Sequence, residues 1–350
     1  MKTSSLPLGL LFALALPSFA QDSATARRAP PIVVSRRRPG LPRQAGSAIL
    51  PPVPRHPPNM KTTLLIALCA ACLAASSAPP DAPDRATEPA GIEEVSLDPG
   101  WTYADRSAIH TGSARLYRAT EGRKNVTVGV NAGHGTEGGS AVKTYCHPDG
   151  SPKITGGTTA AGSVMAVAVS GGMTFADGTP EAQATLDAAR SLRDKLLAKG
   201  YDVLMLRDGA DVQLDNVART VIANQTADCL VSLHWDGDSL AYDKGCFYIS
   251  TPDGIKDMEP VSRYWREHER LGAALVEGLR GKGCRIHGSG KSAIDLTQTS
   301  YSTIPSVDIE LGNQASAHDE ATISTLAEGL LDGIEAFFAS ERMAHPIVAP

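Results

Sequence analysis

The chain has 350 residues, enough for one large domain or two small ones with a buried core. Its composition, 42% hydrophobic and 20% charged residues, excludes a disordered chain and a small disulfide-stabilised scaffold. The net charge of −5 is unevenly distributed: residues 1–80 hold nine Lys and Arg against one acidic residue, and the remainder holds 24 basic against 37 acidic residues. Because phosphate neutralisation requires surplus Lys and Arg, this acidic remainder excludes nucleic acid as the partner.

Two segments near the N-terminus have the pattern of secretory signal peptides. Residues 1–20 contain Lys2, an apolar run and terminal small residues, and residues 60–78 repeat this pattern from Met60. Both apolar runs are too short to span a bilayer, so we expect no transmembrane span and an exported protein, periplasmic or in the cell envelope. Residues 21–59, with seven Arg and many Pro, are expected to be disordered. Because two signals have no evident use, Met60 is expected to be the true start; the alternative is a signal at residue 1 followed by an apolar tether.

The cysteines allow several interpretations. The residues before Cys72 resemble a lipoprotein acylation site, although Cys69 stands where such a site usually has Leu, so a lipid anchor at Cys72 is one of two open alternatives. The cysteines after residue 140 lack the spacing of metal ligands. In an oxidising compartment Cys246 and Cys284 could pair, but the sequence does not determine the connectivity.

Residues 79–124 are expected to form a linker and an N-terminal extension, residues 125–340 a single domain and residues 341–350 a tail. Apolar runs predict strands at 126–131, 201–206, 228–234, 245–249 and 304–310. Helical spacing and capping residues predict a helix that begins at Thr179-Pro180 and ends at Gly200, and further helices at 217–224, 269–280 and 319–339. This alternation predicts an α/β fold: a single three-layer domain with a mostly parallel sheet flanked by helices.

One segment of the domain does not follow the alternation. Residues 136–178 are rich in Gly, Ser and Thr, with a single apolar run at 164–169. We interpret them as a long insertion that contains a hairpin or forms a partial lid.

Three polar residues lie at the carboxyl ends of predicted strands. His134, His234 and Glu310 each end or follow such a strand. In open α/β sheets this edge binds ligands. A single His there would more often bond to a loop, but two His with a carboxylate favour a site. Neutral imidazole and carboxylate are zinc ligands, so we expect a zinc site at the carboxyl edge of the strands.

Three segments resemble, in the same order, motifs of zinc-dependent N-acetylmuramoyl-L-alanine amidases. Residues 131–135 are similar to the family's Asp-Pro-Gly-His-Gly segment, with Asn131-Ala132 in place of Asp-Pro. Residues 219–234 are similar to its Arg…Ala-Asn…Ala-Asp…Ser-Ile-His block, and residues 304–313 to its Pro…Val-Glu-x-Gly ending. The resemblance covers about residues 126–339. It implies Zn²⁺-dependent hydrolysis of the amide bond between N-acetylmuramic acid and L-alanine in peptidoglycan, in cell-wall remodelling or recycling.

The resemblance also implies roles for individual residues. His134 and His234 correspond to the family's zinc ligands, and Glu310 to its catalytic base. The ligand Glu that opens the helix after the first motif corresponds to Glu181, and Glu137 is the alternative. The insertion 136–178 separates the first motif from this helix and could cover the site.

The substrate contacts and the function class are less closely defined. Asp236 and Arg219 are expected to bind the substrate, although a solvated turn is an equal alternative for Asp236, and Trp235 could stack on a sugar or belong to the core. Two alternative functions stay open: a zinc hydrolase of another peptide or amide, and a catalytically silent peptidoglycan-binding module.

Overall fold

The computed structural model describes residues 91–344, with side chains to residue 340. The two signal-like segments, the Arg-rich segment between them and Cys72 therefore lie outside the described residues, as does most of the expected tail. Within residues 91–344, no helix combines the length and the apolar character needed to cross a membrane.

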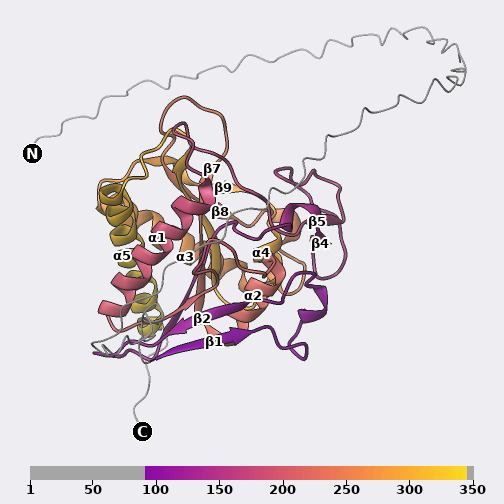
Figure 1. Cartoon of the computed structure of the whole chain (residues 1–350), viewed down its shortest axis with the longest axis horizontal. Coiled ribbons are helices and arrows are strands. Elements are labelled where there is room, and N and C mark those ends of the chain that lie inside the picture. The colour runs from indigo at the N-terminus through magenta and orange to yellow at the C-terminus, as the bar shows by residue number, and fades with distance from the viewer. Residues whose placement is uncertain (1–90, 345–350) are drawn as a thin grey trace, which may run out of the picture. The chain divides into compact units, whose positions relative to one another are not determined.

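An eight-stranded sheet forms the middle layer of the domain (Figure 1). Its strands stand in the order β1 (Ile92–Ser96), β2 (Ser113–Tyr117), β6 (Asp202–Met205), β3 (Thr127–Ala132), β7 (Cys229–Asp236), β10 (Ser306–Asn313), β8 (Cys246–Ser250) and β9 (Ile286–Ala293). The four central strands, β6, β3, β7 and β10, run parallel to one another. The pairings of β1 with β2, β2 with β6 and β10 with β8 are antiparallel, and β8 with β9 is parallel. The predicted α/β class with a mostly parallel sheet is confirmed.

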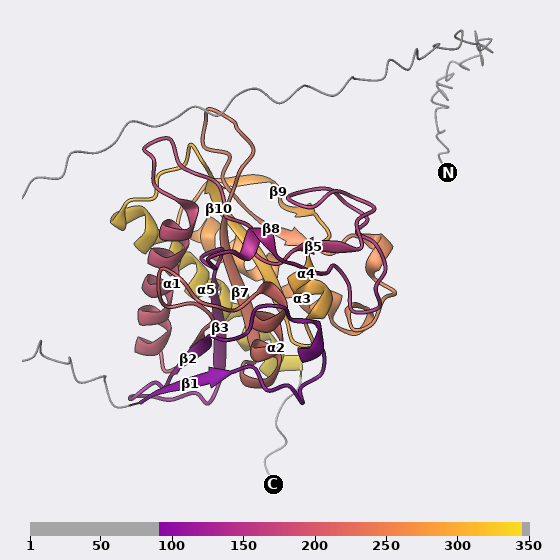
Figure 2. The ribbon, with the colours of Figure 1, turned by 45° about the vertical axis from the view of Figure 1, so that its right-hand side comes forward.

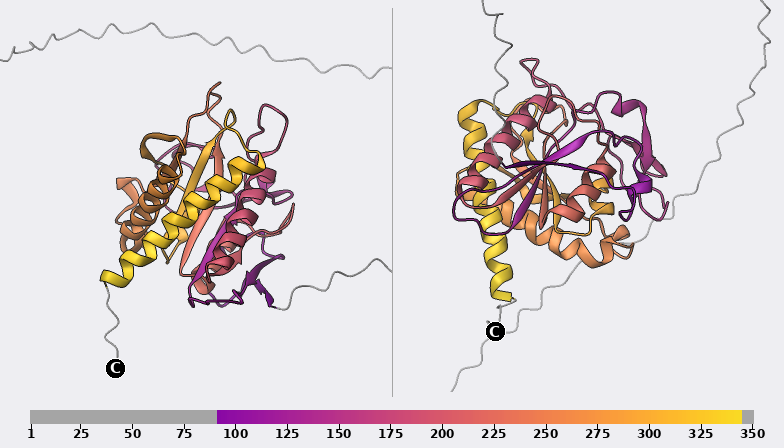
Figure 3. Two further views of the ribbon diagram at one scale, coloured as in Figure 1. Left: turned by 90° about the vertical axis from the view of Figure 1, so that its left-hand side faces the viewer. Right: turned by 60° about the horizontal axis from the view of Figure 1, so that its bottom comes forward.

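Helices cover both faces of this sheet. The long helices α1 (Glu181–Ala198), α3 (Val261–Gly281) and α5 (Glu320–Ala344) lie side by side on one face (Figure 3, left). The shorter α2 (Asn216–Thr226) and α4 (Thr297–Tyr301) pack together on the other. Neighbouring residues of β6 alternate between the two apolar clusters, with Met205 on the α1 side and Leu204 on the α2 side, as the pleat of a strand requires. Short 3₁₀ helices cover Ala104–Arg106, Gly139–Ala141 and Asp253–Ile255.

Three features differ from the sequence prediction. The expected linker and extension at 79–124 contributes β1 and β2 to the sheet, and β9 forms its other edge. These edge strands were missed because their residues are mostly polar or partly exposed, so no continuous apolar run marks them. The hydroxyl of Thr179 makes no capping bond to α1: Pro180 is the N-cap, and the helix begins at Glu181.

The insertion contains the expected hairpin. Strands β4 (Lys143–Tyr145) and β5 (Met165–Val167) pair antiparallel in a small separate sheet, beside α4 (Figure 2). The buried Asp295, between β9 and α4, anchors the segment: its carboxylate contacts His147 Nε2 at 2.8 Å and accepts a hydrogen bond from the Ile154 amide at 2.8 Å. The insertion is therefore fixed to the connection between β9 and α4 rather than free in solvent.

We expect acid to destabilise the protein through Asp202, the first residue of β6. Burial alone would raise the pKa of this carboxyl, but hydrogen bonds from Arg123, the Ala119 amide and Arg118 outweigh burial and lower it. A carboxyl whose pKa is lowered on folding stabilises the protein at pH values above its ordinary pKa of 3.8. This stabilisation is lost as the pH falls below that value. Urea midpoints of the protein and of Asp202→Asn should therefore differ at pH 7 and converge towards pH 3. A constant gap over this range contradicts the assignment.

Candidate metal centre

Three side chains converge at the carboxyl edge of β3 and β7. His134 lies just beyond β3, Glu181 is the first residue of α1, and His234 lies in β7. His134 Nε2 is 2.8 Å from Glu181 Oε1, His234 Nδ1 is 3.2 Å from the same oxygen, and the two imidazole nitrogens are 3.1 Å apart. Glycine is required beside them: a Cβ on Gly133 would stand 2.3 Å from His234 Cε1. The fold therefore brings into contact three side chains that lie up to 100 residues apart in the sequence.

Backbone groups of the insertion and of β7 orient this trio. His134 Nδ1 is 2.9 Å from the carbonyl oxygen of Ser170 and donates to it, so Nε2 is the nitrogen that faces Glu181 and is available to a metal. Glu181 accepts hydrogen bonds from the amides of Met173, at 2.8 Å, and Trp235, at 3.0 Å. Burial would raise the pKa of Glu181, but hydrogen bonds with both histidines lower it far below its usual range. Glu181 is thus an ionised carboxylate.

The donor atoms fit a zinc ion. Zinc takes imidazole nitrogen and carboxylate oxygen at about 2.0–2.2 Å in a tetrahedron, which places neighbouring ligand atoms roughly 3.3 Å apart. The three atoms, His134 Nε2, His234 Nδ1 and Glu181 Oε1, are 2.8–3.2 Å apart, so small side-chain shifts would suffice. Among the described residues, one group of His, Cys, Asp or Glu side chains could hold a metal ion, and it consists of these three residues. Glu137, the alternative, is exposed and outside this group.

Two buried arginines support the loop that carries His134. Arg219 donates to the carbonyl oxygens of Ala132, at 3.2 Å, and His134, at 2.7 Å, and to Asn131 Oδ1 at 3.0 Å. Arg207 donates to the carbonyls of Ala132 and Gly133. Burial lowers the pKa of Arg207 to about 10 and that of Arg219 to about 9, so both stay protonated at neutral pH. These bonds hold His134 at its φ of 65°, a left-handed conformation that few non-glycine residues adopt.

The expectation that Arg219 binds substrate is therefore corrected. Its side chain is 1% exposed and its guanidinium nitrogens are engaged by acceptors of the protein itself. The sequence signal was an Arg within a family-like motif, and such a motif does not distinguish a substrate contact from a residue that supports the loop of His134. Asn131, which replaces the family's Asp, accepts one of these hydrogen bonds and donates another to Ser232 Oγ.

We expect Arg219→Met to destabilise the fold. The substitution leaves several buried carbonyl oxygens without a donor, and a lost hydrogen bond to a charged group costs about 1.5–3 kcal/mol. The free energy of unfolding should fall by about 3 kcal/mol or more in urea titrations. The matched control is Arg263→Met, on the exposed side of α3, whose effect should stay below about 0.5 kcal/mol. Equal stability of the two variants would show that Arg219 does not support the loop.

A pair of carboxyls, Asp308 and Glu310, lies on β10, next to β7. In the parallel register Glu310 is opposite His234 and Asp308 is opposite Ser232, so both carboxyls share the face of His234. Burial raises the pKa of Glu310 to about 8, against the lowering effect of His234. Burial also raises the pKa of Asp308, and His234 again opposes the rise. Glu310 Oε2 and Asp308 Oδ1 have no hydrogen-bond partner among the described residues.

These groups line one cavity of about 570 Å³. Its walls come from the end of the insertion, the carboxyl edge of the sheet and the connection from β9 to α4. Asp236 lies on this wall and forms an ion pair with Lys244. Trp235 is 2% exposed and packs on Phe175 in the core, which leaves little of its face for a sugar.

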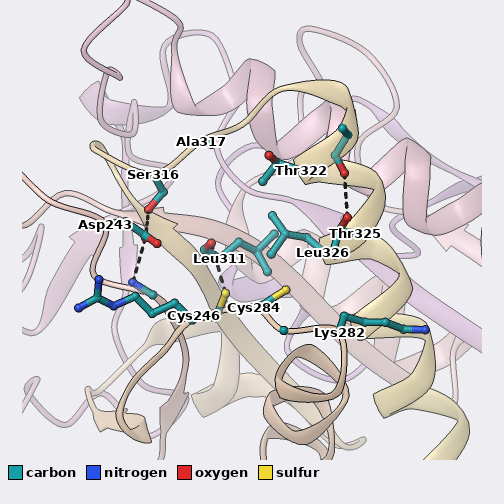
Figure 4. Close-up of a pocket in the computed structure, with 14 residues that line it drawn as sticks. Asp243, Cys246, Lys282, Cys284, Leu311, Ser316, Ala317, Thr322, Thr325 and Leu326 are labelled. Carbon is teal, nitrogen blue, oxygen red and sulfur yellow. Dashed lines mark hydrogen bonds between the residues drawn. The ribbon is translucent and has the colours of Figure 1, made fainter.

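A smaller cavity of about 360 Å³ lies elsewhere, between β8, the loop before β9 and α5 (Figure 4). It is lined by both Cys246 and Cys284 and by none of the proposed metal ligands. All four cysteines among residues 91–344 are free thiols, so the pairing considered from the sequence is not formed in this structure.

Comparison with known protein families identifies the family of this chain. The family described as N-acetylmuramoyl-L-alanine amidase matches residues 128–335, well over half of the chain. The chain therefore belongs to the N-acetylmuramoyl-L-alanine amidase family, a class of amide hydrolases, as the sequence motifs predicted. A comparison with curated proteins gives no match.

Two solved structures are similar to this chain at low sequence identity. The N-acetylmuramyl-L-alanine amidase of Mycobacterium smegmatis is 19% identical, with a TM-score of 0.51, over 62% of this chain and 98% of that one. The apo form of the Mycobacterium abscessus amidase is 22% identical, with a TM-score of 0.49, over 61% of this chain and 99% of that one. The first of these likenesses supports the fold assignment.

Proposed function

We propose that this protein hydrolyses the amide bond between N-acetylmuramic acid and L-alanine in peptidoglycan, with Zn²⁺ held by His134, Glu181 and His234. The observation that carries the proposal is the convergence of these three ligands with a fourth group, Glu310, in one cavity of a chain from this family. Family membership supports the bond that is cleaved, and the donor set supports the metal.

The residues around the cavity fit an acid–base role for Glu310. When bound, zinc would lower the pKa of a water molecule and polarise the amide carbonyl. Glu310 would accept the proton of the attacking water and deliver it to the departing amine of L-alanine, leaving a lactyl carboxylate and a free amine. Burial raises the pKa of Glu310 above that of an ordinary carboxyl, towards the neutral range in which an acid–base group works. The backbone contacts at Ser170, Met173 and Trp235 keep the ligand side chains oriented.

Asp236 is proposed as a substrate contact on the cavity wall. Its carboxylate is partly exposed and is held by Lys244, so it can accept a hydrogen bond from a substrate amide. We further propose that the protein acts outside the cytoplasmic membrane, where peptidoglycan lies. Fractionation of cells that express the full chain tests this location, and recovery in the cytoplasm alone contradicts it.

The proposed reaction is tested by digestion of purified peptidoglycan. The zinc-loaded protein should release peptides with a new N-terminal alanine and leave intact glycan strands, which mass spectrometry distinguishes. Cleavage inside the peptides would instead favour a zinc hydrolase of another amide. Binding without release of any peptide would indicate a silent wall-binding module.

A further inference from the structure

The two nitrogens of the His234 imidazole face different surroundings. Nδ1 faces the metal position, 3.2 Å from Glu181 Oε1 and 3.1 Å from His134 Nε2. Nε2 is buried and has no hydrogen-bond partner among the described residues, yet it lies 3.7 Å from Oδ2 of Asp308. A neutral imidazole carries one bare nitrogen and one N–H, and a metal ligand must use the bare one. With a metal on Nδ1, Nε2 of His234 must therefore carry the hydrogen, and this hydrogen needs an acceptor.

The carboxyl of Asp308 is placed to supply that acceptor. The side chain is 3% exposed, and Oδ2 accepts a hydrogen bond of 3.1 Å from Gln298 Nε2, whereas Oδ1 has no partner in the described part of the chain. Among the ion pairs of the described residues, Asp308 is paired with His234 alone. A buried polar atom without a partner is costly. The unpaired Nε2 of His234 thus lies 3.7 Å from Oδ2 of Asp308 on one face of the sheet, and the carboxyl of Asp308 still has unused acceptor capacity.

His134, the other proposed metal ligand, has an acceptor for its second ring nitrogen. His134 turns its Nε2 to the metal position and its Nδ1 to the carbonyl oxygen of Ser170, 2.9 Å away. The two histidines thus present opposite nitrogens to the metal, and only His134 has its second nitrogen satisfied. Closing the gap at His234 requires a shift of less than about 1 Å to reach hydrogen-bond distance.

We propose that Asp308 is a positioning residue for the metal centre: its carboxyl oxygen accepts the Nε2–H of His234, fixes this tautomer and directs Nδ1 to the metal. Gln298 holds the carboxyl in place from the other side. An acceptor of this kind orients a ligand histidine and makes its free nitrogen more basic, and its loss typically weakens metal binding 10–100-fold. The inference rests on the proposed zinc-dependent function.

The test is the zinc dissociation constant of the full chain, measured by competition with a chelator. Asp308→Asn, close in size to the native residue, should bind zinc about 10–100-fold more weakly than the unsubstituted protein, at unchanged fold by circular dichroism. The matched control is Asp236→Asn, a carboxylate in the same cavity that is paired with Lys244; its zinc affinity should stay within about threefold of the unsubstituted protein. Asp308→Glu, which keeps the carboxyl, should restore most of the affinity.

A second readout separates positioning from packing. In zinc-loaded protein labelled with ¹⁵N-histidine, the Nε2–H proton of His234 should be observed and protected from exchange, and Asp308→Asn should remove that protection. Unchanged zinc affinity with unchanged His234 resonances would overturn the inference, as would a loss of thermal stability alone. If Asp308→Asn does not fold, Asp308→Glu is compared with the unsubstituted protein instead. In that variant the Nε2–H proton of His234 must remain protected from exchange. Absence of zinc binding by the unsubstituted protein would instead refute the proposed function.

Discussion

Replacement of Glu310 by Gln is expected to leave zinc bound and to lower the turnover of peptidoglycan by about 10²–10⁴-fold. Glu310 is not one of the three converging donors, and one of its carboxyl oxygens is buried without a partner among the described residues. Gln keeps the size of the side chain but cannot take up a proton. Zinc per chain by elemental analysis and turnover should be measured on the same preparation at one pH.

The control for this substitution is Glu277→Gln, on the exposed surface of α3, which should have neither effect. Full activity of Glu310→Gln would remove the proposed role of this residue. Loss of zinc in the same variant would place Glu310 among the ligands and would require a different base.

The sheet and its edge could be predicted because the central strands are buried on both faces. Such strands consist mostly of apolar residues, as in β3 and β7, and a strand of this kind next to a helical pattern implies a parallel sheet. The carboxyl ends of parallel strands share one edge, so the positions of His134, His234 and Glu310 at strand ends were enough to predict that they lie together. The edge strands β1 and β9 lack this signal.

The environment of the candidate metal centre could not be predicted in the same way. Arg219 resembled a substrate contact, and only the fold shows that its guanidinium lies beneath the loop of His134. Asp308 stands two residues before Glu310 and so shares its side of the strand, but the sequence does not indicate how far it lies from His234. Ser170 and Met173 act through backbone atoms, for which residue type carries no signal.

Glu181→Gln is expected to lower zinc content and activity together. Glu181 accepts hydrogen bonds from two backbone amides and directs Oε1 at both histidines, so it is oriented as a ligand and is ionised. Two histidines alone would bind zinc weakly, because an open site needs three protein ligands to retain its metal. The measurement is zinc per chain after dialysis, with turnover on peptidoglycan in parallel.

Glu137→Gln is the matched control for this prediction, because Glu137 is the other candidate ligand and lies close to His134 in the sequence. Its side chain is exposed and outside the converging group, so zinc content and turnover should both match the unsubstituted protein. Normal zinc in Glu181→Gln together with zinc loss in Glu137→Gln would transfer the third ligand to Glu137. Such a result would also require the insertion to rearrange, because the backbone amide of Met173 donates a hydrogen bond to Glu181 in this structure. The pair of variants therefore tests the ligand and the position of the insertion at once.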